Sequence, residues 1–446
     1  MSEPNGRTIE QLNMHTFLNK FKNNDHVVIF LFAWTALLFG VDLFSGIRWF
    51  QTGDFGFRTV MAYHGLLIAA WLLLLMVFFR PVKTSLFLQK IIHYGIAFSV
   101  LLTGVGTWFV HYGNCSLWTG IFLTGLVFTV LISIVITVVS IRYFFQLPAD
   151  KINSLALWTV VFAFGSMLLA AFPGLLAALI QTLGSFISPE SPTSILAASR
   201  TGNYVDAHSH QMLASFLSAA FTLPLVYRQV PLKQKKISLL QTIGLILILL
   251  ATLAQTTLYQ YCAFSGWEPP VLFHHQLNGI PLDDAFLSIL GLGMLLLLPT
   301  FWLTTGKKTH WLPISRLIAA LLFAYLLAVV LLGIFIEFHE SFFGQAEGNA
   351  PGVPHDLAFI RGHLLFGFFI IPLLLSVLLH ARNFSVLHVH FFIVFGWLIV
   401  ITGAAGVLFW VFSLNTILIK TAFYLTFLFL WMPVFLFRQE NPENKT

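Results

Sequence analysis

The run Arg361-Gly-His363-Leu-Leu-Phe-Gly-Phe-Phe opens a hydrophobic segment that continues to His380. It places a histidine inside a stretch long enough to cross a membrane. An ionisable side chain is costly there and is usually functional.

Two earlier segments begin in the same way. One reads Thr59-Val-Met-Ala-Tyr-His64-Gly-Leu-Leu, and the other reads Asp206-Ala-His208-Ser-His210-Gln-Met. Each puts a histidine near the start of a long apolar run. Because a histidine recurs at the start of three apolar segments, we infer that these histidines share one role.

The composition is that of a membrane protein. Of 446 residues, 58% are hydrophobic and only 9% are charged, whereas soluble domains have about 25% charged residues. The sequence therefore predicts an all-α, polytopic membrane protein. The two cysteines, Cys115 and Cys262, exclude a disulfide scaffold. Both are predicted at the outer face, where a disulfide between them and two unpaired thiols are both open.

Apolar runs of about 20 residues predict twelve transmembrane helices. Their expected ranges are 26–48, 58–79, 86–111, 118–143, 155–185, 205–227, 237–262, 284–304, 313–336, 357–380, 386–412 and 416–437. Residues 1–25 form a polar N-terminal segment, 26–437 a single transmembrane domain and 438–446 a short tail.

The positive charges predict the orientation of these helices. Of the 23 lysines and arginines, all but five fall on the side of the N-terminus. The five exceptions are Arg48, Arg58, Arg200, Arg361 and Lys420. By the positive-inside rule, we expect both termini in the cytoplasm of a cell with a bacterial-type inner membrane. This topology explains the net charge of +6 without a nucleic-acid partner.

The histidines of these three segments fall on the second, sixth and tenth predicted helices, so that one helix in each block of four carries them. All these helices enter from the predicted outer face, and His64 and His363 each lie roughly 9 Å below the helix start. His274 and His275 follow the seventh helix on the same side. Because neutral imidazole binds haem iron, copper and zinc, we expect a haem or metal site there. The alternatives are hydrogen bonds to neighbouring helices and, for the adjacent pair, a solvated loop.

Two stretches resemble a known family. Phe57-Arg-Thr-Val-Met-Ala-Tyr-His64-Gly-Leu-Leu-Ile-Ala-Ala-Trp-Leu-Leu resembles the second helix of the haem-copper oxidase superfamily, nearest to the large subunit of nitric oxide reductase. Gly362-His363-Leu-Leu-Phe-Gly-Phe-Phe is similar to the tenth helix of that family. The resemblance implies twelve helices in three pseudo-repeats of four over about 26–437, although only these two helices are close in sequence.

The resemblance implies two metal centres. His64 and His363 would be the axial ligands of a low-spin haem, of b-type. His274, His275 and either His208 or His210 would bind copper or non-haem iron. Residues two apart on a helix point about 200° from each other, so only one of the last two can face that site. Without a Cys-x-x-Cys-His motif, electrons would come from quinol or from a small electron-donor subunit.

The chain departs from the family at its reaction centre. The tenth helix of the family has a second histidine where this chain has Arg361, and arginine stays protonated and cannot bind iron. Met212 and Ala214 stand where the sixth helix of the family carries a carboxylate or tyrosine. We therefore expect one haem per chain, weak or absent turnover, and an Arg361 that pairs with a haem propionate.

Three functions are open from the sequence. The first is a divergent oxidoreductase acting on nitric oxide or oxygen, and the second is a non-catalytic haem- or metal-binding protein of the same fold. The third is a twelve-helix metal-ion transporter. Transporters usually carry charged ligands near the membrane midplane, and this chain has almost none there. The sequence therefore favours the first two.

Overall fold

The computed structural model describes residues 22–44, 57–113, 116–148, 152–184, 192–226, 235–265, 282–303, 311–332, 358, 361–362, 364–381 and 386–437. Over these ranges the chain forms twelve α-helices and two π-helical segments, with no strand. Among the described helices, nine are long and apolar enough to cross a membrane. The prediction of an all-helical membrane protein is confirmed at this level, and the grouping into three repeats stays a prediction.

The predicted spans correspond in order to the observed helices. The α-helices are α2 (Lys22–Phe44), α3 (Phe57–Phe79), α4 (Leu86–Gly113), α5 (Ser116–Phe145), α6 (Ser154–Gly184), α7 (Pro192–Val226), α8 (Lys235–Ser265), α9 (Leu282–Trp302), α10 (Trp311–Tyr325), α13 (Ile371–Ala381), α14 (Val386–Ser413) and α15 (Ile417–Phe437). The π-helical segments are η1 (Leu326–Leu331) and η2 (Leu364–Ile370). The ninth predicted span thus consists of α10 and η1, and the tenth contains η2 and α13.

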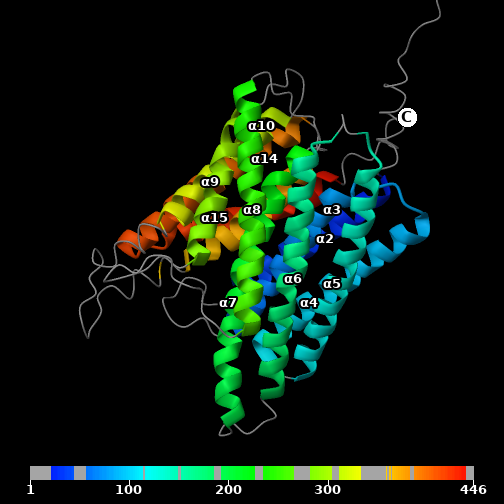
Figure 1. Ribbon diagram of the computed structural model, residues 1–446, viewed down its shortest axis with the longest axis vertical. Helices are drawn as coiled ribbons and strands as arrows, with labels where there is room; N and C mark the ends of the chain where they lie inside the picture. The colour runs from blue at the N-terminus through cyan, green and yellow to red at the C-terminus, as the bar shows by residue number, and fades with distance from the viewer. Residues whose placement is uncertain are drawn as a thin grey trace, which may run out of the picture.

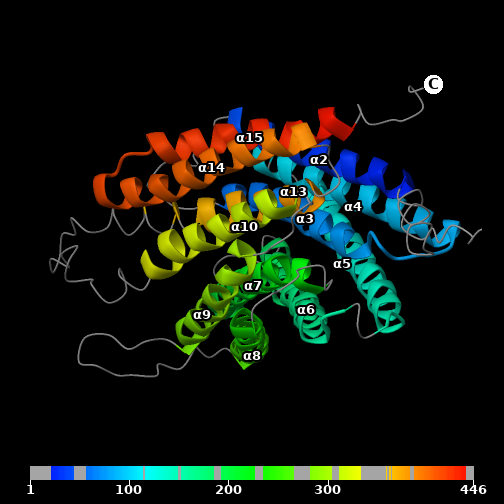
Figure 2. The ribbon, with the colours of Figure 1, turned by 90° about the horizontal axis from the view of Figure 1, so that it is seen from above.

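The helices that carry the predicted histidines lie inside the bundle. Helix α13 packs against α3, α7, α10, α14 and α15, and its residues 371–380 are all buried. Figure 2 shows α3 and α13 between a layer of α2, α14 and α15 and the group formed by α6 to α9. From His64 onward in α3, from His210 onward in α7 and throughout α13, most side chains therefore contact other helices rather than lipid.

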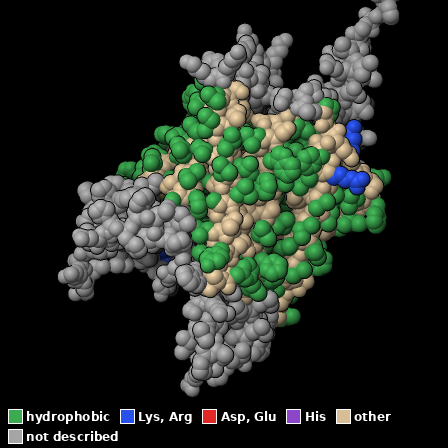
Figure 3. Space-filling model, viewed as in Figure 1, with side chains coloured by type: hydrophobic (Ala, Val, Ile, Leu, Met, Phe, Trp, Pro, Cys, Tyr) green, Lys and Arg blue, Asp and Glu red, His purple; other side chains and the backbone are tan. Residues whose placement is uncertain are grey.

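The peripheral helices present apolar side chains outward. Phe87 and Leu86 on α4 are 74% and 66% exposed, and Ile417 on α15 is 67% exposed. Figure 3 shows hydrophobic side chains spread over the visible face, with lysine and arginine visible mainly at the right-hand edge. Contiguous apolar surface of this extent fits contact with the hydrocarbon of a membrane.

Polar side chains tie the central helices together. Ser376 Oγ of α13 donates a hydrogen bond to the carbonyl of Ala70 on α3 (3.2 Å), and His380 Nε2 lies 3.0 Å from the carbonyl of Leu73. Trp71 Nε1 on α3 donates to Ser133 Oγ on α5 (3.1 Å). In an apolar environment such bonds fix which faces of the helices meet.

The two π-helical segments face each other. A Cβ added to Gly367 in η2 would lie 3.5 Å from Val329 Cγ2 in η1 and 3.7 Å from Tyr325 Cε2 at the start of η1. π-helical turns are rare and often mark functional sites, and η2 directly follows the predicted ligand His363 in the sequence. The sequence did not predict them, since helices that are apolar on every side have no amphipathic stripe in which a change of period could be seen.

Candidate metal site

His64 and His208 lie side by side. His64 is on α3 and His208 on α7, and their ring centroids are 5.9 Å apart with an interplanar angle of 8°. The ring of Phe122 on α5 meets His64 edge-on at 5.8 Å. The structure thus joins two histidines that the family resemblance assigned to different centres.

The ring of His208 is oriented by α6. Its Nδ1 lies 2.6 Å from the carbonyl oxygen of Ala170. Because a carbonyl can only accept a hydrogen bond, Nδ1 carries the proton and neutral Nε2 keeps a lone pair. Metal-binding histidines are commonly oriented in this way, with the second ring nitrogen bonded to a backbone carbonyl or carboxylate.

Gly174 makes room for this ring. A Cβ at position 174 would lie 2.5 Å from His208 Nδ1 and 2.6 Å from Cε1, closer than carbon can approach. Ala170 and Gly174 are one turn apart on α6, so one residue holds the ring while the other leaves space for it.

The distance between His64 and His208 is that of two ligands of one metal ion, but their rings are stacked 8° from parallel and would have to turn for both ring planes to contain the ion. Metal–nitrogen bonds of about 2 Å place the centroids of two imidazoles on the same ion about 5–6.5 Å apart. The observed 5.9 Å falls within that range. The described residues contain no group of three or more His, Cys, Asp or Glu side chains suited to a metal. Further ligands would come from outside the described part, where the predicted ligands His274, His275 and His363 lie.

His210 faces a different helix. Its ring stacks on that of Tyr259 on α8, with centroids 5.7 Å apart and an interplanar angle of 16°. His208 contacts α3 and α6, so the two histidines point apart as their spacing predicts. We call the region around His64, His208 and His210 the histidine end of the bundle.

Arg361 lies in the interior. It is only 3% exposed, and a Cβ on the adjacent Gly362 would lie 3.1 Å from Val407 Cγ1 of α14. A buried cation needs a nearby anion or several acceptors. The expected pairing of Arg361 with a haem propionate stays a prediction.

Only one of the two cysteines lies in the described part of the chain. Cys262 is buried on α8, whereas Cys115 lies outside the described part, so their pairing stays open.

A set of buried and half-buried Ser, Thr and Gln side chains adjoins the histidine end, between α6, α7 and α8, which run side by side in Figure 1. We call it the polar seam. It consists of Ser166, Gln211, Ser215, Ser218, Thr222, Thr252, Gln255, Thr256 and Gln260. The sequence did not predict the polar seam, because its residues are uncharged and the candidate site residues were sought among histidines and charged side chains. The spacing of Gln211, Ser215, Ser218 and Thr222 along one face of α7 was the available signal.

Gln211 joins all three helices of the seam. Its Nε2 donates to the carbonyl of Ser166 (2.9 Å), and its Oε1 accepts from Gln260 Nε2 (2.8 Å). We expect Gln211→Met, of similar volume, to lower the free energy of unfolding by about 1–3 kcal/mol, because buried polar groups lose their partners. Denaturant unfolding in detergent measures it.

Thr257→Val is the control for this substitution. Thr257 is on the same helix as Gln260 but is exposed, and among the described residues it bonds only to the Leu253 carbonyl of its own helix. Its effect should stay within about 0.5 kcal/mol. Equal stability of Gln211→Met and the wild type would show that the seam does not hold the helices together.

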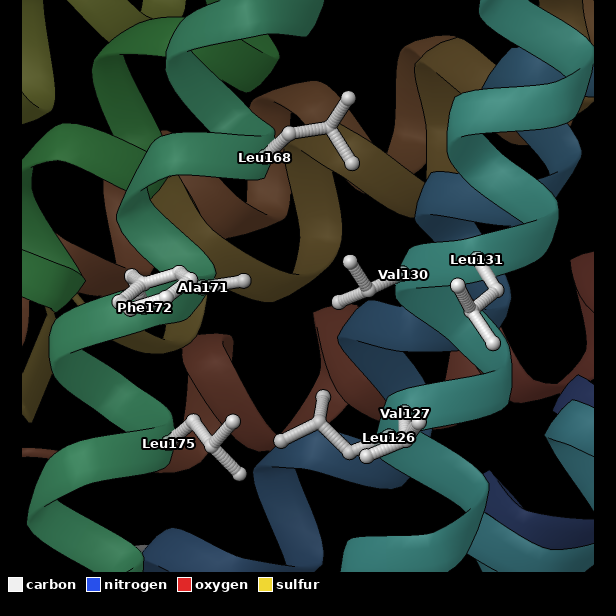
Figure 4. A pocket seen from close by; sticks show the side chains of 8 residues that line it. All are labelled: Leu126, Val127, Val130, Leu131, Leu168, Ala171, Phe172 and Leu175. Carbon is white, nitrogen blue, oxygen red and sulfur yellow. The ribbon is translucent and has the colours of Figure 1, made fainter.

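A groove between α5 and α6 is wholly apolar. Its volume is about 150 Å³, and Figure 4 shows the side chains that line it. They are Leu126, Val127, Val130, Leu131, Leu168, Ala171, Phe172 and Leu175. With no polar side chain in its lining, it offers no group for chemistry, so the candidate site is the histidine end.

Comparison with known proteins identifies no relative. No protein-family model, no curated protein and no solved structure matches this chain. The assignment of function therefore depends on the residues themselves.

Proposed function

We propose that this chain is an integral membrane protein that binds redox-active copper or iron at its histidine end and transfers electrons there. The observation that carries the proposal is the pair His64 and His208, with parallel rings 5.9 Å apart. The bond from His208 Nδ1 to the Ala170 carbonyl supports it, since it presents Nε2 as a ligand. Copper or iron bound there would supply one-electron chemistry.

The haem-copper oxidase resemblance extends this proposal. We propose that His363 completes the haem site with His64, and that His274 and His275 contribute to the second metal with His208 or His210. A haem iron has only two axial positions, so with His363 as the second ligand of the haem, His64 and His208 would belong to neighbouring centres; a non-haem ion could instead be bound by both.

The redox chemistry is proposed to be limited. In the resembling family, the position of Arg361 holds the proximal ligand of an open-coordinate haem, and arginine cannot serve. We expect one haem at most and weak reductase turnover. Quinol or a small electron-donor subunit would supply the electrons from within the membrane, with both termini in the cytoplasm.

A metal-ion transporter is the second candidate. The polar seam favours it, because it leads from the histidine end along the interior of the bundle. The absorption spectrum separates the two functions, since a transporter has no need of a redox-active resident metal.

The test is spectroscopy of the purified protein in its oxidised and reduced forms, together with metal analysis. We expect at least one equivalent of copper or iron per chain and a spectrum that changes on reduction. If haem is present, carbon monoxide should bind at well under one equivalent. A protein without metal or redox-dependent absorption would rule out the electron-transfer function. A full carbon-monoxide adduct would contradict the altered reaction centre.

A further inference from the structure

An exposed apolar stripe on α5 leads from Arg142 to the groove between α5 and α6. Arg142 is in the last turn of α5 and is exposed. Val138, Ile134 and Leu131 precede it at helical spacing, so all four side chains share one face of the helix. The three apolar side chains are exposed as well, and Leu131 lines the groove. Apolar side chains thus connect a cation at the end of α5 with the groove.

Helix α6 borders the same surface. The rings of Phe145 on α5 and Trp158 on α6 lie 5.2 Å apart, and both side chains are exposed. Further along the two helices, Leu131 of α5 and Phe172 of α6 are among the side chains on either side of the groove (Figure 4). Tryptophan is typical of the membrane–water interface. The pair of Phe145 and Trp158 therefore fits the level of lipid headgroups, and the groove lies deeper in the membrane.

The depth of the groove matches one leaflet of a bilayer. From Arg142 to Leu131 along α5 is about 16.5 Å, at about 1.5 Å per residue. Half of a hydrocarbon core about 30 Å thick is about 15 Å. An acyl chain whose headgroup lies beside Arg142 therefore reaches the groove. Because the lining of the groove has no polar side chain, the groove suits the end of such a chain and not a polar head.

Other cations lie at the same end of the bundle as Arg142. Helices α4 and α5 are consecutive, pack side by side and run antiparallel. A Cβ on Gly95 of α4 would lie 2.8 Å from Ile132 Cδ1 of α5, so Arg142 is level with the start of α4. Lys83, just before α4, and Lys90, in its second turn, are both exposed. Among the described side chains no carboxylate lies at this end, so it attracts anions.

We propose that the α5 stripe and the groove form a binding site for one anionic phospholipid. The guanidinium of Arg142 donates hydrogen bonds to the headgroup phosphate, which suits its forked donors. One acyl chain lies along α5 with its end in the groove, where it fills space that the side chains of α5 and α6 leave open. The positive charge at this end of the bundle selects a lipid of net negative charge over a zwitterionic one.

Native mass spectrometry of the purified, delipidated protein tests the headgroup. Palmitoyl-oleoyl phosphatidylglycerol and phosphatidylcholine carry the same chains, so a difference between them reports the charge of the head. We expect the first phosphatidylglycerol to bind at least about fivefold more tightly than the first phosphatidylcholine. Arg142→Gln should lower the affinity for phosphatidylglycerol about fivefold, the effect of one cation near a membrane surface. Equal binding of the two lipids to the wild type would overturn the proposal.

Lys90→Gln is the matched control. It removes the same charge at the same end, but Lys90 is five residues from Gly95 and so points about 140° away from the side of α4 that contacts α5. This variant should keep the wild-type affinity for phosphatidylglycerol. Equal losses in Lys90→Gln and Arg142→Gln would show a general attraction at this end and no site at Arg142, which also overturns the proposal.

Chain length tests the groove. Ala171→Phe places a ring in the groove and should lower the affinity for palmitoyl-oleoyl phosphatidylglycerol about threefold or more, because the chain loses its contacts there. Dioctanoyl phosphatidylglycerol has chains too short to reach the groove, so it should bind this variant and the wild type equally, which also shows that the variant is folded. Unchanged binding of the long-chain lipid, or an equal loss for both lipids, would contradict the groove's part. None of these results bears on metal binding at the histidines.

Discussion

Gly174→Ala is expected to weaken metal binding by about 10–100-fold, the range found when a group that orients a metal ligand is disturbed. The added methyl would lie 2.5 Å from His208 Nδ1, so the ring must move. That movement breaks the bond to the Ala170 carbonyl, which fixes the tautomer and direction of His208. Titration of the metal-free protein with copper or iron measures the change.

Gly165→Ala is the control. Gly165 is on the same helix, and a Cβ there would meet nothing within 4 Å. Both substitutions gain about the same helix propensity, so the difference between them isolates the contact with His208. If the two variants bind metal with equal affinity, the orientation of His208 by α6 has no part in the site.

Gly106→Ala is expected to lower the free energy of unfolding by about 1–3 kcal/mol, as overpacking usually does. A Cβ at position 106 on α4 would lie 2.6 Å from the backbone nitrogen of Phe122 and 2.7 Å from its Cα on α5. Since these are backbone atoms, no side chain can turn aside, and the two helices must separate. Unfolding by denaturant in detergent gives the magnitude.

The separation of α4 and α5 should also displace His64 at the histidine end, because Phe122 of α5 contacts His64. Gly120→Ala on α5 is the control, since a Cβ there meets nothing within 4 Å. Wild-type stability for Gly106→Ala would show that α4 and α5 do not pack as closely as described.

The helices could be predicted from the sequence, because long apolar runs bounded by polar residues have few other structures available in a membrane. The opposed directions of His208 and His210 followed from helix geometry. In contrast, the contact of His64 with His208 depends on how α3 and α7 pack, and spacing along the chain contains no information on that.

The supporting residues were harder still to predict. Ala170 acts through its backbone and Gly174 through the absence of a side chain, so neither has a chemical signature. The polar seam consists of residue types that are common in membrane helices, and only its burial between three helices distinguishes it. Within the described part of the chain, neither amide atom of Gln255 has a hydrogen-bond partner, which only a structure can show.

The metal content of three variants tests most directly whether His64 and His208 share one metal ion. His64→Ala, His208→Ala and the double variant are purified beside His93→Ala, a histidine on α4 away from the pair. If the two bind one ion, each single variant loses the same equivalent and the double variant loses no more, whereas His93→Ala keeps the wild-type content. If each single variant loses a different equivalent and the double variant loses both, the histidines belong to separate centres. If none loses metal, the pair is not a metal site.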